Sequence, residues 1–230
     1  MGYDGRMAKI YIATGNMNKK RELSQLLSGY TIVTPSDEGI SFDPDETGTT
    51  FYENSMIKAR ALWNIVHQPV IADDSGICVD ALGGLPGIYS ARYAGPDYPK
   101  GRPDGTKIPQ QEQNKFIIAQ TNEVLAQKNV NTSHFPNGPR SCRYVCSMVL
   151  MLSPDRFFIT QETMEGTLVP DIQDAAGTGG FGYDPLFFLP QYGKTTAQLS
   201  AEEKNAISHR GKALRAMVAI INSIEGGLKL

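Results

Sequence analysis

Polar and basic side chains near the N-terminal end of the chain have the types and spacing that phosphate binding requires. The stretch Thr14-Gly15-Asn16-Met17-Asn18-Lys19 lies between an apolar run and a helical pattern. The first turn of a helix offers unpaired N–H groups and partial positive charge, to which Thr14 and Asn16 add polar side chains and Lys19 adds a full charge. These residues favour a phosphate cradle, and an Asn-capped helix with a solvated lysine is the alternative.

Carboxylates form the second group of candidates. Glu46 lies just ahead of a predicted helix, and Asp73 and Asp74 end a buried-type strand, where open α/β sheets place ligands. Neighbouring carboxylates repel each other, and Mg²⁺ with oxygen ligands would relieve this repulsion in a phosphate site. Successive strand side chains face opposite ways, so Asp73 and Asp74 should not both reach one metal, and the pattern does not say which one does. A solvated Asp-Asp turn is the alternative.

Two further stretches lie nearer the C-terminal end. Gly179-Gly180-Phe181-Gly182-Tyr183-Asp184-Pro185 combines glycines, which let backbone approach a ligand, with aromatic faces that can stack on a planar base. In the stretch from Lys204 to Arg210, Lys204 and Ser208 share one face of a predicted helix. The alternatives are a Gly-rich turn with its aromatics in the core, and a solvated helix face.

The hydrophobic pattern predicts the elements that position these residues. Strands are expected at residues 9–14, 31–33, 70–73, 143–152, 157–169 and 186–189. Helices are expected after residue 16, from Thr50 to about Val66 behind a capping box, between the polar loops 96–109 and 129–139, and from Ser200 through Ile221 behind a second capping box. Strands mixed with helices, without a long linker or a repeat, indicate one α/β domain over residues 1–230.

Composition limits the partners of the chain. Its 230 residues include 22 basic and 24 acidic side chains, for a net charge of -2, which argues against gripping a nucleic-acid backbone over many phosphates. No apolar run approaches the ~18 residues of a membrane span. The three cysteines, odd in number and without a secretory leader, predict reduced thiols and a cytoplasmic location.

Six stretches taken in order resemble the inosine triphosphate pyrophosphatase family, whose members hydrolyse non-standard purine nucleoside triphosphates. They are A-T-G-N-x-x-K at 13–19, E-T-G-x-T-F-x-E-N-x-x-x-K-A at 46–59, A-D-D-S-G at 72–76, G-G-L-P-G-I-Y-S-A-R-Y-A-G at 83–95, G-G-F-G-Y-D-P at 179–185 and K-N-x-x-S-H-R at 204–210. The resemblance spans nearly the whole chain. Residues 1–6, interpreted as a flexible extension, and the two polar loops look longer than the family pattern needs.

The resemblance implies a mixed α/β fold, with a central β-sheet flanked by helices and a substrate cleft between two lobes. It also implies Mg²⁺-dependent hydrolysis of ITP, dITP or XTP to the monophosphate and pyrophosphate, and a homodimer. Glu46 and Asp74 would hold Mg²⁺, and Asp74 would be the general base. Substrate contacts would come from Thr14, Asn16, Lys19, Lys58, Ser75, Phe181, Gly182, Tyr183, Asp184, Lys204, His209 and Arg210.

Within that assignment, donors from His209 and Arg210 would satisfy the 6-keto oxygen of hypoxanthine or xanthine and oppose the amino group of adenine. Two other functions stay open. One is a non-catalytic module that senses ITP or XTP. The other is a single-stranded RNA binder that stacks bases on Phe181 and Tyr183, which the net charge of -2 disfavours.

Overall fold

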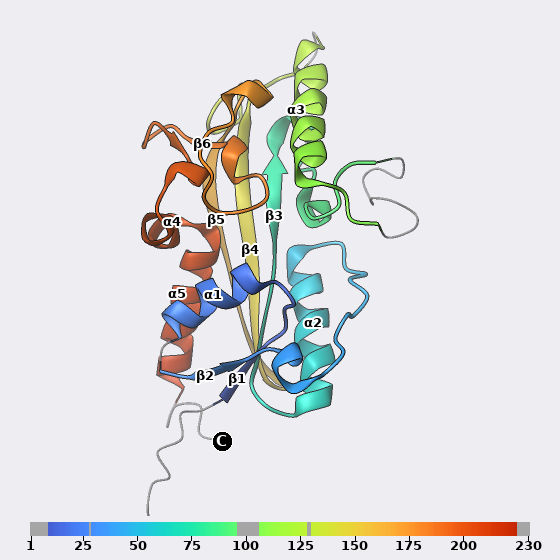
Figure 1. Ribbon diagram of the computed structural model, residues 1–230, viewed down its shortest axis with the longest axis vertical. Helices are drawn as coiled ribbons and strands as arrows, with labels where there is room; N and C mark the ends of the chain where they lie inside the picture. Colours follow the sequence, from blue (N-terminus) through green and yellow to red (C-terminus); the bar gives the residue numbers. More distant parts are fainter. Residues whose placement is uncertain (1–8, 28, 96–105, 128–129, 225–230) are drawn as a thin grey trace, which may run out of the picture. The chain divides into compact units, whose positions relative to one another are not determined.

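The computed structural model describes residues 9–27, 29–95, 106–127 and 130–224. These residues form one mixed sheet of seven strands together with five α-helices and short 3₁₀ turns (Figure 1). The predicted α/β class is therefore confirmed. The expected extension at residues 1–6 and residues 96–105 of the first polar loop lie outside the described residues.

The strands have the order β2-β1-β3-β4-β5-β6-β7 in the sheet. Their bounds are β1 Lys9–Ile12, β2 Thr31–Val33, β3 Val70–Val79, β4 Ser141–Ser153, β5 Arg156–Leu168, β6 Phe187–Leu189 and β7 Lys194–Thr195. Strand β1 pairs in parallel with β2 and β3, whereas β6 pairs antiparallel with β5 and β7. The short strand β7 was not predicted from the sequence.

The helices are α1 Met17–Leu26, α2 Phe51–Val66, α3 Gln110–Ala126, α4 Ala201–Ile207 and α5 His209–Ser223. Helix α1 connects β1 to β2, and α2 connects β2 to β3, because parallel neighbours need a crossover connection. The predicted capping box opens α2: the Glu53 N–H donates to Thr50 Oγ1 at 3.1 Å, and the Glu53 carboxylate accepts from the Thr50 N–H at 3.1 Å. This cap fixes the first turn of the helix that carries Lys58.

The chain divides into two compact units. The first contains the described residues of Met1–Asp74, Cys146–Glu162 and Arg210–Leu230, and the second contains those of Ser75–Val145 and Thr163–His209. Strands β3, β4 and β5 each contribute residues to both units. The single domain expected over residues 1–230 remains a prediction, because compactness alone does not show whether either unit folds by itself.

The sheet of the first unit is buried on both faces, because side chains alternate along each strand. Ile10 and Ile12 pack with residues of α1 and α5. Tyr11 and Ala13 pack with residues of α2. Figure 1 shows α1 and α5 on one side of β1 and α2 on the other. A polar residue of the adjacent strand β3 therefore meets different helices according to the face from which it extends.

The second unit has its own apolar core. Ile77 and Val79, in the second half of β3, pack with Ile117 of α3 and Phe187 of β6. Tyr93 is fully buried in the same cluster. This core holds the turn that leads into β6, where several predicted site residues lie.

Strand β3 is longer than the predicted strand, which ended at Asp73. The prediction that Asp73 and Asp74 lie at a strand end is wrong, because buried residues continue the strand beyond them. Gly76 does not interrupt it. A Cβ at Gly76 would clash with the side chain of Ser90, so the glycine allows a close approach of the following segment to the strand.

The single helix predicted over residues 200–221 is two helices, α4 and α5, which meet at Ser208. The backbone of Ser208 is extended, with φ -67° and ψ 154°, and its N–H donates to the Lys204 carbonyl oxygen at 2.8 Å, which closes the last turn of α4. Serine suits such a junction because its side chain competes for backbone groups. The predicted continuous helix is therefore wrong, and His209 and Arg210, which begin α5, belong to different units.

Among the described residues, no helix is long and apolar enough to cross a membrane. The three cysteines are free and buried, as expected for reduced thiols. Burial raises the pKa of Cys78 to about 11, that of Cys146 to about 12, and that of Cys142 well above its ordinary value. These thiols are poor nucleophiles near neutral pH, because the thiolate is the reactive form.

Candidate functional site

Asp73 and Asp74 extend from opposite faces of β3, as the two-residue period of a strand requires. Asp73 contacts Lys19 at the start of α1 and Arg210 of α5. Asp74 contacts Lys58 of α2. The two carboxylates therefore have different partners. The sequence pattern left open which of the two aspartates would reach a metal ion. The structure brings Asp74, on the α2 side, together with Lys58.

Lys58 joins the two predicted metal ligands. Its Nζ lies 3.0 Å from Glu46 Oε1 and 3.3 Å from Asp74 Oδ1, so both carboxylates reach one cation. Burial would lower the pKa of Lys58, but Asp74, Asp73 and Glu46 outweigh that effect and raise it. Burial raises the pKa of Asp74, and Lys58 and Lys19 counter this only in part. Asp74 is therefore a buried carboxylate that accepts a proton more readily than an exposed one.

Asn54 is a buried member of this cluster that the sequence interpretation did not select. Its Nδ2 donates to Asp74 Oδ2 at 3.3 Å, and its Oδ1 accepts from the Gly48 N–H at 2.9 Å. It thus connects β3 to the loop that carries Glu46. The sequence did contain a signal that could have identified Asn54 as a site residue. It lies four residues before Lys58 in α2, and residues four apart share a helix face.

Asp73 holds two cations on the other face of β3. Its Oδ2 lies 2.9 Å from Lys19 Nζ and 3.3 Å from Arg210 Nε. Arg210 Nη1 in turn lies 2.6 Å from Glu22 Oε2. Lys19 Nζ also lies 3.5 Å from the Asp73 carbonyl oxygen, so the ammonium is directed toward β3. Burial would raise the pKa of Asp73, but Lys19 and Arg210 outweigh burial and lower it. Asp73 therefore stays ionised and fixes Lys19.

The predicted phosphate cradle is a tight turn that leads into α1. The Asn16 N–H donates to Thr14 Oγ1 at 3.1 Å, and Asn16 Oδ1 accepts from the Lys19 N–H at 3.4 Å. Asn16 therefore caps α1, which was the alternative interpretation of this stretch. Because Asn16 is exposed and Thr14 is half-buried, the cap does not remove the turn from solvent. Phosphate binding here stays a prediction.

Asp184 is the centre of a polar cluster in the second unit. It is almost completely buried and accepts from the Phe181 N–H at 2.7 Å, the Thr196 hydroxyl at 3.0 Å and Lys204 Nζ at 2.6 Å. Lys204 Nζ also lies over the Phe181 ring, 5.1 Å from its centroid. Gly180 has φ 70°, and a Cβ there would clash with the Asp184 carboxylate. Only glycine suits this position.

Tyr183 and His209 are packed inside the second unit. Tyr183 is 3% exposed and its hydroxyl donates to the Ser90 carbonyl oxygen at 3.0 Å. The structure therefore does not present the Tyr183 ring to a base, in agreement with the alternative that placed it in the core. His209 is 5% exposed and stacks on Tyr144, with ring centroids 4.8 Å apart and planes 11° apart. Its neighbour in sequence, Arg210, contacts Asp73 in the first unit instead.

Two predicted substrate residues lie beside these clusters. Ser75 follows Asp74 in β3 and is half-buried. Gly182 has φ 66° in the turn that precedes Asp184. Their contacts with substrate stay predictions.

Three further residues contact predicted site residues without having been selected from the sequence: Glu22, Tyr144 and Thr196. Glu22 follows Lys19 by three residues on α1, a spacing that indicates a shared face. Tyr144 and Thr196 gave no such signal, because their contacts join segments far apart in the chain.

No group of three or more His, Cys, Asp or Glu side chains converges as a metal site within the part of the chain that the structure describes. Glu46 and Asp74 form a pair of oxygen donors. Magnesium is often held by one or two carboxylates, with phosphate oxygens and waters completing its shell. The pair is therefore suited to an ion that arrives with a phosphate ligand.

Known proteins similar to this chain match it over most of its length. A sequence profile of the Ham1 family matches residues 10–220. A Treponema denticola protein named dITP/XTP pyrophosphatase is 51% identical over 207 residues, which cover 90% of this chain and 94% of that protein. An Escherichia coli K12 protein of the same name is 41% identical over 217 residues, which cover 92% of this chain and 97% of that protein.

Solved structures extend the similarity to the fold. A HAM1 protein from Coxiella burnetii has a TM-score of 0.77 and 30% identity, covering 94% of this chain and 99% of that one. The Ham1 protein of Staphylococcus aureus has a TM-score of 0.73 and 32% identity, covering 93% and 98% respectively. Such coverage includes the segments of both units.

Proposed function

This chain belongs to the Ham1 family, and we propose that it is a nucleoside triphosphate pyrophosphatase that acts on the non-standard purine nucleotides ITP, dITP and XTP. The products are the nucleoside monophosphate and pyrophosphate. Relatives named dITP/XTP pyrophosphatase, up to 51% identical over most of the chain, support the reaction class. The structural observation that carries the proposal is the contact of one ammonium, Lys58 Nζ, with both Glu46 and Asp74.

Glu46 and Asp74 fit magnesium as ligands. Both are oxygen donors, the type that Mg²⁺ prefers, and they already converge on one cation in Lys58. Asp74 is buried near Glu46 and Asp73, and burial together with their negative charges raises its pKa. A divalent cation at this position would offset the repulsion between these carboxylates. When bound, the ion supplies positive charge to phosphate oxygens and lowers the pKa of water.

Asp74 acts as the general base in the proposed reaction. Water attacks the α-phosphorus while Asp74 accepts its proton. The bond from the α-phosphorus to the bridging oxygen breaks, and the electron pair leaves with pyrophosphate. Burial raises the pKa of Asp74, which strengthens it as a base. Lys19 and Lys58 stabilise the negative charge that grows on the leaving group, and Asp73 keeps the Lys19 ammonium in place.

The polar cluster of the second unit reads the base in this proposal. Hypoxanthine and xanthine carry a keto oxygen at the 6-position, which accepts a hydrogen bond from Lys204 or His209. Adenine carries an amino group there, and two donors that face each other lose about 1–3 kcal/mol for each buried unpaired group. Asp184 holds the Lys204 ammonium beside the Phe181 ring. Guanine shares the keto oxygen, so this contact separates ITP from ATP and not ITP from GTP.

Arg210 is proposed to hold Asp73, because its guanidinium contacts both Asp73 and Glu22. Its expected contact with the 6-keto oxygen stays a prediction. Thr14 and Asn16 are proposed to contact the triphosphate next to Lys19. A homodimer and a cytoplasmic location complete the proposal, the second on the basis of three free cysteines.

A panel of nucleoside triphosphates tests this function. ITP, dITP, XTP, GTP and ATP are each incubated with the full chain and Mg²⁺, and the products are identified by ³¹P NMR. The proposal expects pyrophosphate and the monophosphate from the first three, and pyrophosphate release that is slower by roughly 10²–10⁴-fold in Asp74→Asn. Asp155→Asn, at an exposed aspartate between β4 and β5, is the matched control. Orthophosphate as the product, or binding of ITP without any product, would refute the proposal.

A further inference from the structure

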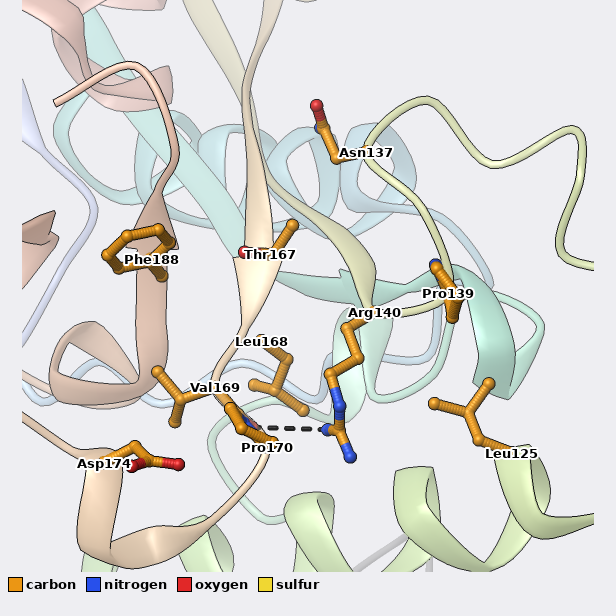
Figure 2. A pocket seen from close by; sticks show the side chains of 10 residues that line it. All are labelled: Leu125, Asn137, Pro139, Arg140, Thr167, Leu168, Val169, Pro170, Asp174 and Phe188. Carbon is orange, nitrogen blue, oxygen red and sulfur yellow. Dashed lines mark hydrogen bonds between the residues drawn. The ribbon is translucent and has the colours of Figure 1, made fainter. Parts of the chain in front are cut away.

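A pocket of about 640 Å³ in the second unit is lined by none of the residues assigned above to substrate or metal (Figure 2). Its volume lies in the range of small-molecule sites. Most of its lining side chains are apolar, and these are Leu125, Pro139, Leu168, Val169, Pro170 and Phe188. They come from α3, from the segment before β4, from β5 and the residues after it, and from β6.

Arg140 is the one cation among the lining residues. Its Nη1 donates to the Val169 carbonyl oxygen at 3.3 Å, and its Nη2 donates to Asn122 Oδ1. Both acceptors are neutral. Within the described ranges, no carboxylate lies at ion-pair distance from this guanidinium, which has five N–H donors in total. Arg140 is thus a charged group with unused donors inside an apolar pocket.

Partial burial also acts on Arg140 itself. Burial lowers the pKa of Arg140, and the carboxylate of Asp174 counters this in part. An anion that enters beside a partly desolvated cation stabilises it, because the local dielectric is lower than that of water. Figure 2 shows the guanidinium among the lining residues, with Pro170 on one side in this view and Leu125 on the other.

We propose that this pocket binds a small organic monocarboxylate with an apolar body. The planar guanidinium fork of Arg140 matches a carboxylate, and the walls formed by Leu125 and Phe188 accept the apolar part. Asp174 also lines the pocket and repels a second negative charge. A carboxylate with one charge therefore fits better than a phosphate monoester with two.

Octanoate is the probe for the test. It is titrated into the full-length ¹⁵N-labelled protein, and backbone amide shifts are followed. The proposal expects saturable shifts at amides of the pocket, such as Thr167 and Val169. Affinity for octanoate should fall at least about tenfold in Arg140→Gln, since hydrogen bonds to charged groups are among the strong ones. Arg156→Gln, at an exposed arginine at the start of β5, should leave it unchanged.

Two control ligands and one further variant test separately whether binding depends on the single negative charge of the ligand and on the apolar wall of the pocket. Octanamide, which has the same chain without the charge, and octyl phosphate should both bind more weakly than octanoate. Leu125→Asn, which changes an apolar wall and leaves Arg140 in place, should also weaken octanoate binding. Hydrolysis of ITP should be the same in Arg140→Gln as in the wild type, because this site is independent of the proposed reaction.

Several results would overturn the proposal. They are the absence of saturable shifts, shifts confined to other residues, equal affinity for octanoate and octanamide, tighter binding of octyl phosphate, or an unchanged affinity in Arg140→Gln. Sedimentation equilibrium addresses a second copy of the chain as the occupant. If Arg140→Gln dissociates an oligomer that octanoate does not affect, the pocket is an interface and the proposal is wrong.

Discussion

Replacing Asp73 with asparagine should destabilise the protein strongly. The side chain of Asp73 is 0% exposed and its Oδ2 contacts both Lys19 and Arg210. Asparagine keeps the size but removes the charge, so Arg210, with only 5% of its side chain exposed, loses one of its two carboxylate partners. Removing one partner of a buried ion pair costs about 3–5 kcal/mol when the other charge is left unpaired. Because Arg210 keeps Glu22 as a partner, the loss in Asp73→Asn should lie near the lower end of that range.

Urea unfolding followed by the fluorescence of Trp63 measures this loss. Trp63 is the one tryptophan of the chain, and its Nε1 donates to the Leu152 carbonyl oxygen at 3.0 Å within the first unit. The matched control is Asp155→Asn, which removes an exposed carboxylate in the turn between β4 and β5. The control should change the urea midpoint far less, because exposed charges are screened by water.

A double-variant cycle isolates the ion pair. Arg210→Met alone should also destabilise the protein. Asp73→Asn combined with Arg210→Met should cost less than the two single changes added together, because either change already breaks the contact between these two side chains. Equal midpoints for wild type and Asp73→Asn, or strict additivity in the cycle, would refute this account of Asp73.

Asp73 should make the stability of the protein decrease as the pH falls. The folded pKa of Asp73 lies below its unfolded value of about 4, so the unfolded chain binds this proton more tightly. The stabilising contribution is therefore fully present above the unfolded pKa and is lost as pH falls through the folded one. The loss of stability between about pH 5 and pH 2 should be shallower in Asp73→Asn than in the wild type. Parallel curves would contradict the assignment.

The remaining predictions concern the reaction and the thiols. Asp74→Asn should unfold in urea much as the wild type does, because burial raises the pKa of Asp74 and folding therefore already disfavours its charged form, unlike that of Asp73. It should lose roughly 10²–10⁴-fold in kcat for pyrophosphate release, the usual contribution of a general base; retained turnover would exclude that role. Chelation of divalent ions should stop turnover, and Glu46→Gln should require more Mg²⁺ for half-maximal rate; a rate indifferent to chelator would refute metal dependence. Lys204→Met should lower the ITP-over-ATP ratio of kcat/KM about tenfold or more, and an unchanged ratio would argue against base reading by this lysine. The three thiols should react with a thiol reagent at pH 8 far more slowly in the native than in the unfolded protein, because burial raises the pKa of each; fast native modification would contradict their burial.

The elements with local signals were predicted well from the sequence. The Thr50 and Glu53 capping box fixed the start of α2 correctly, because both bonds of the box lie within four residues. The alternation of strand side chains separated Asp73 from Asp74 correctly. Neither prediction needed knowledge of tertiary contacts.

The failures have tertiary causes. The second half of β3 was missed because the acidic pair Asp73 and Asp74 was interpreted as the end of the strand, whereas both carboxylates are buried and the strand continues to Val79. The break at Ser208 was missed because the apolar pattern continues across it. Both His209 and Arg210 follow that break and begin α5, although they belong to different units; their expected role at the base stays a prediction.

The sequence could not predict which side chains pair with one another at the candidate site, because these contacts join segments that are far apart in the chain. Arg210 meets Asp73, 137 positions away in the chain, and no periodicity relates the two. The family resemblance implied that Lys58 contacts substrate and that Asp74 holds Mg²⁺, but it did not predict the contact between the two side chains. The structure adds the physical reason, which is that α2 covers the face of β3 from which Asp74 extends.

Hydrolysis of ITP in ¹⁸O-labelled water identifies the phosphorus atom that water attacks. Mass spectrometry of the products locates the oxygen that came from water. Attack at the α-phosphorus should leave one ¹⁸O atom in the inosine monophosphate and none in the pyrophosphate. Label in the pyrophosphate, or in orthophosphate released instead of it, would refute the proposed reaction.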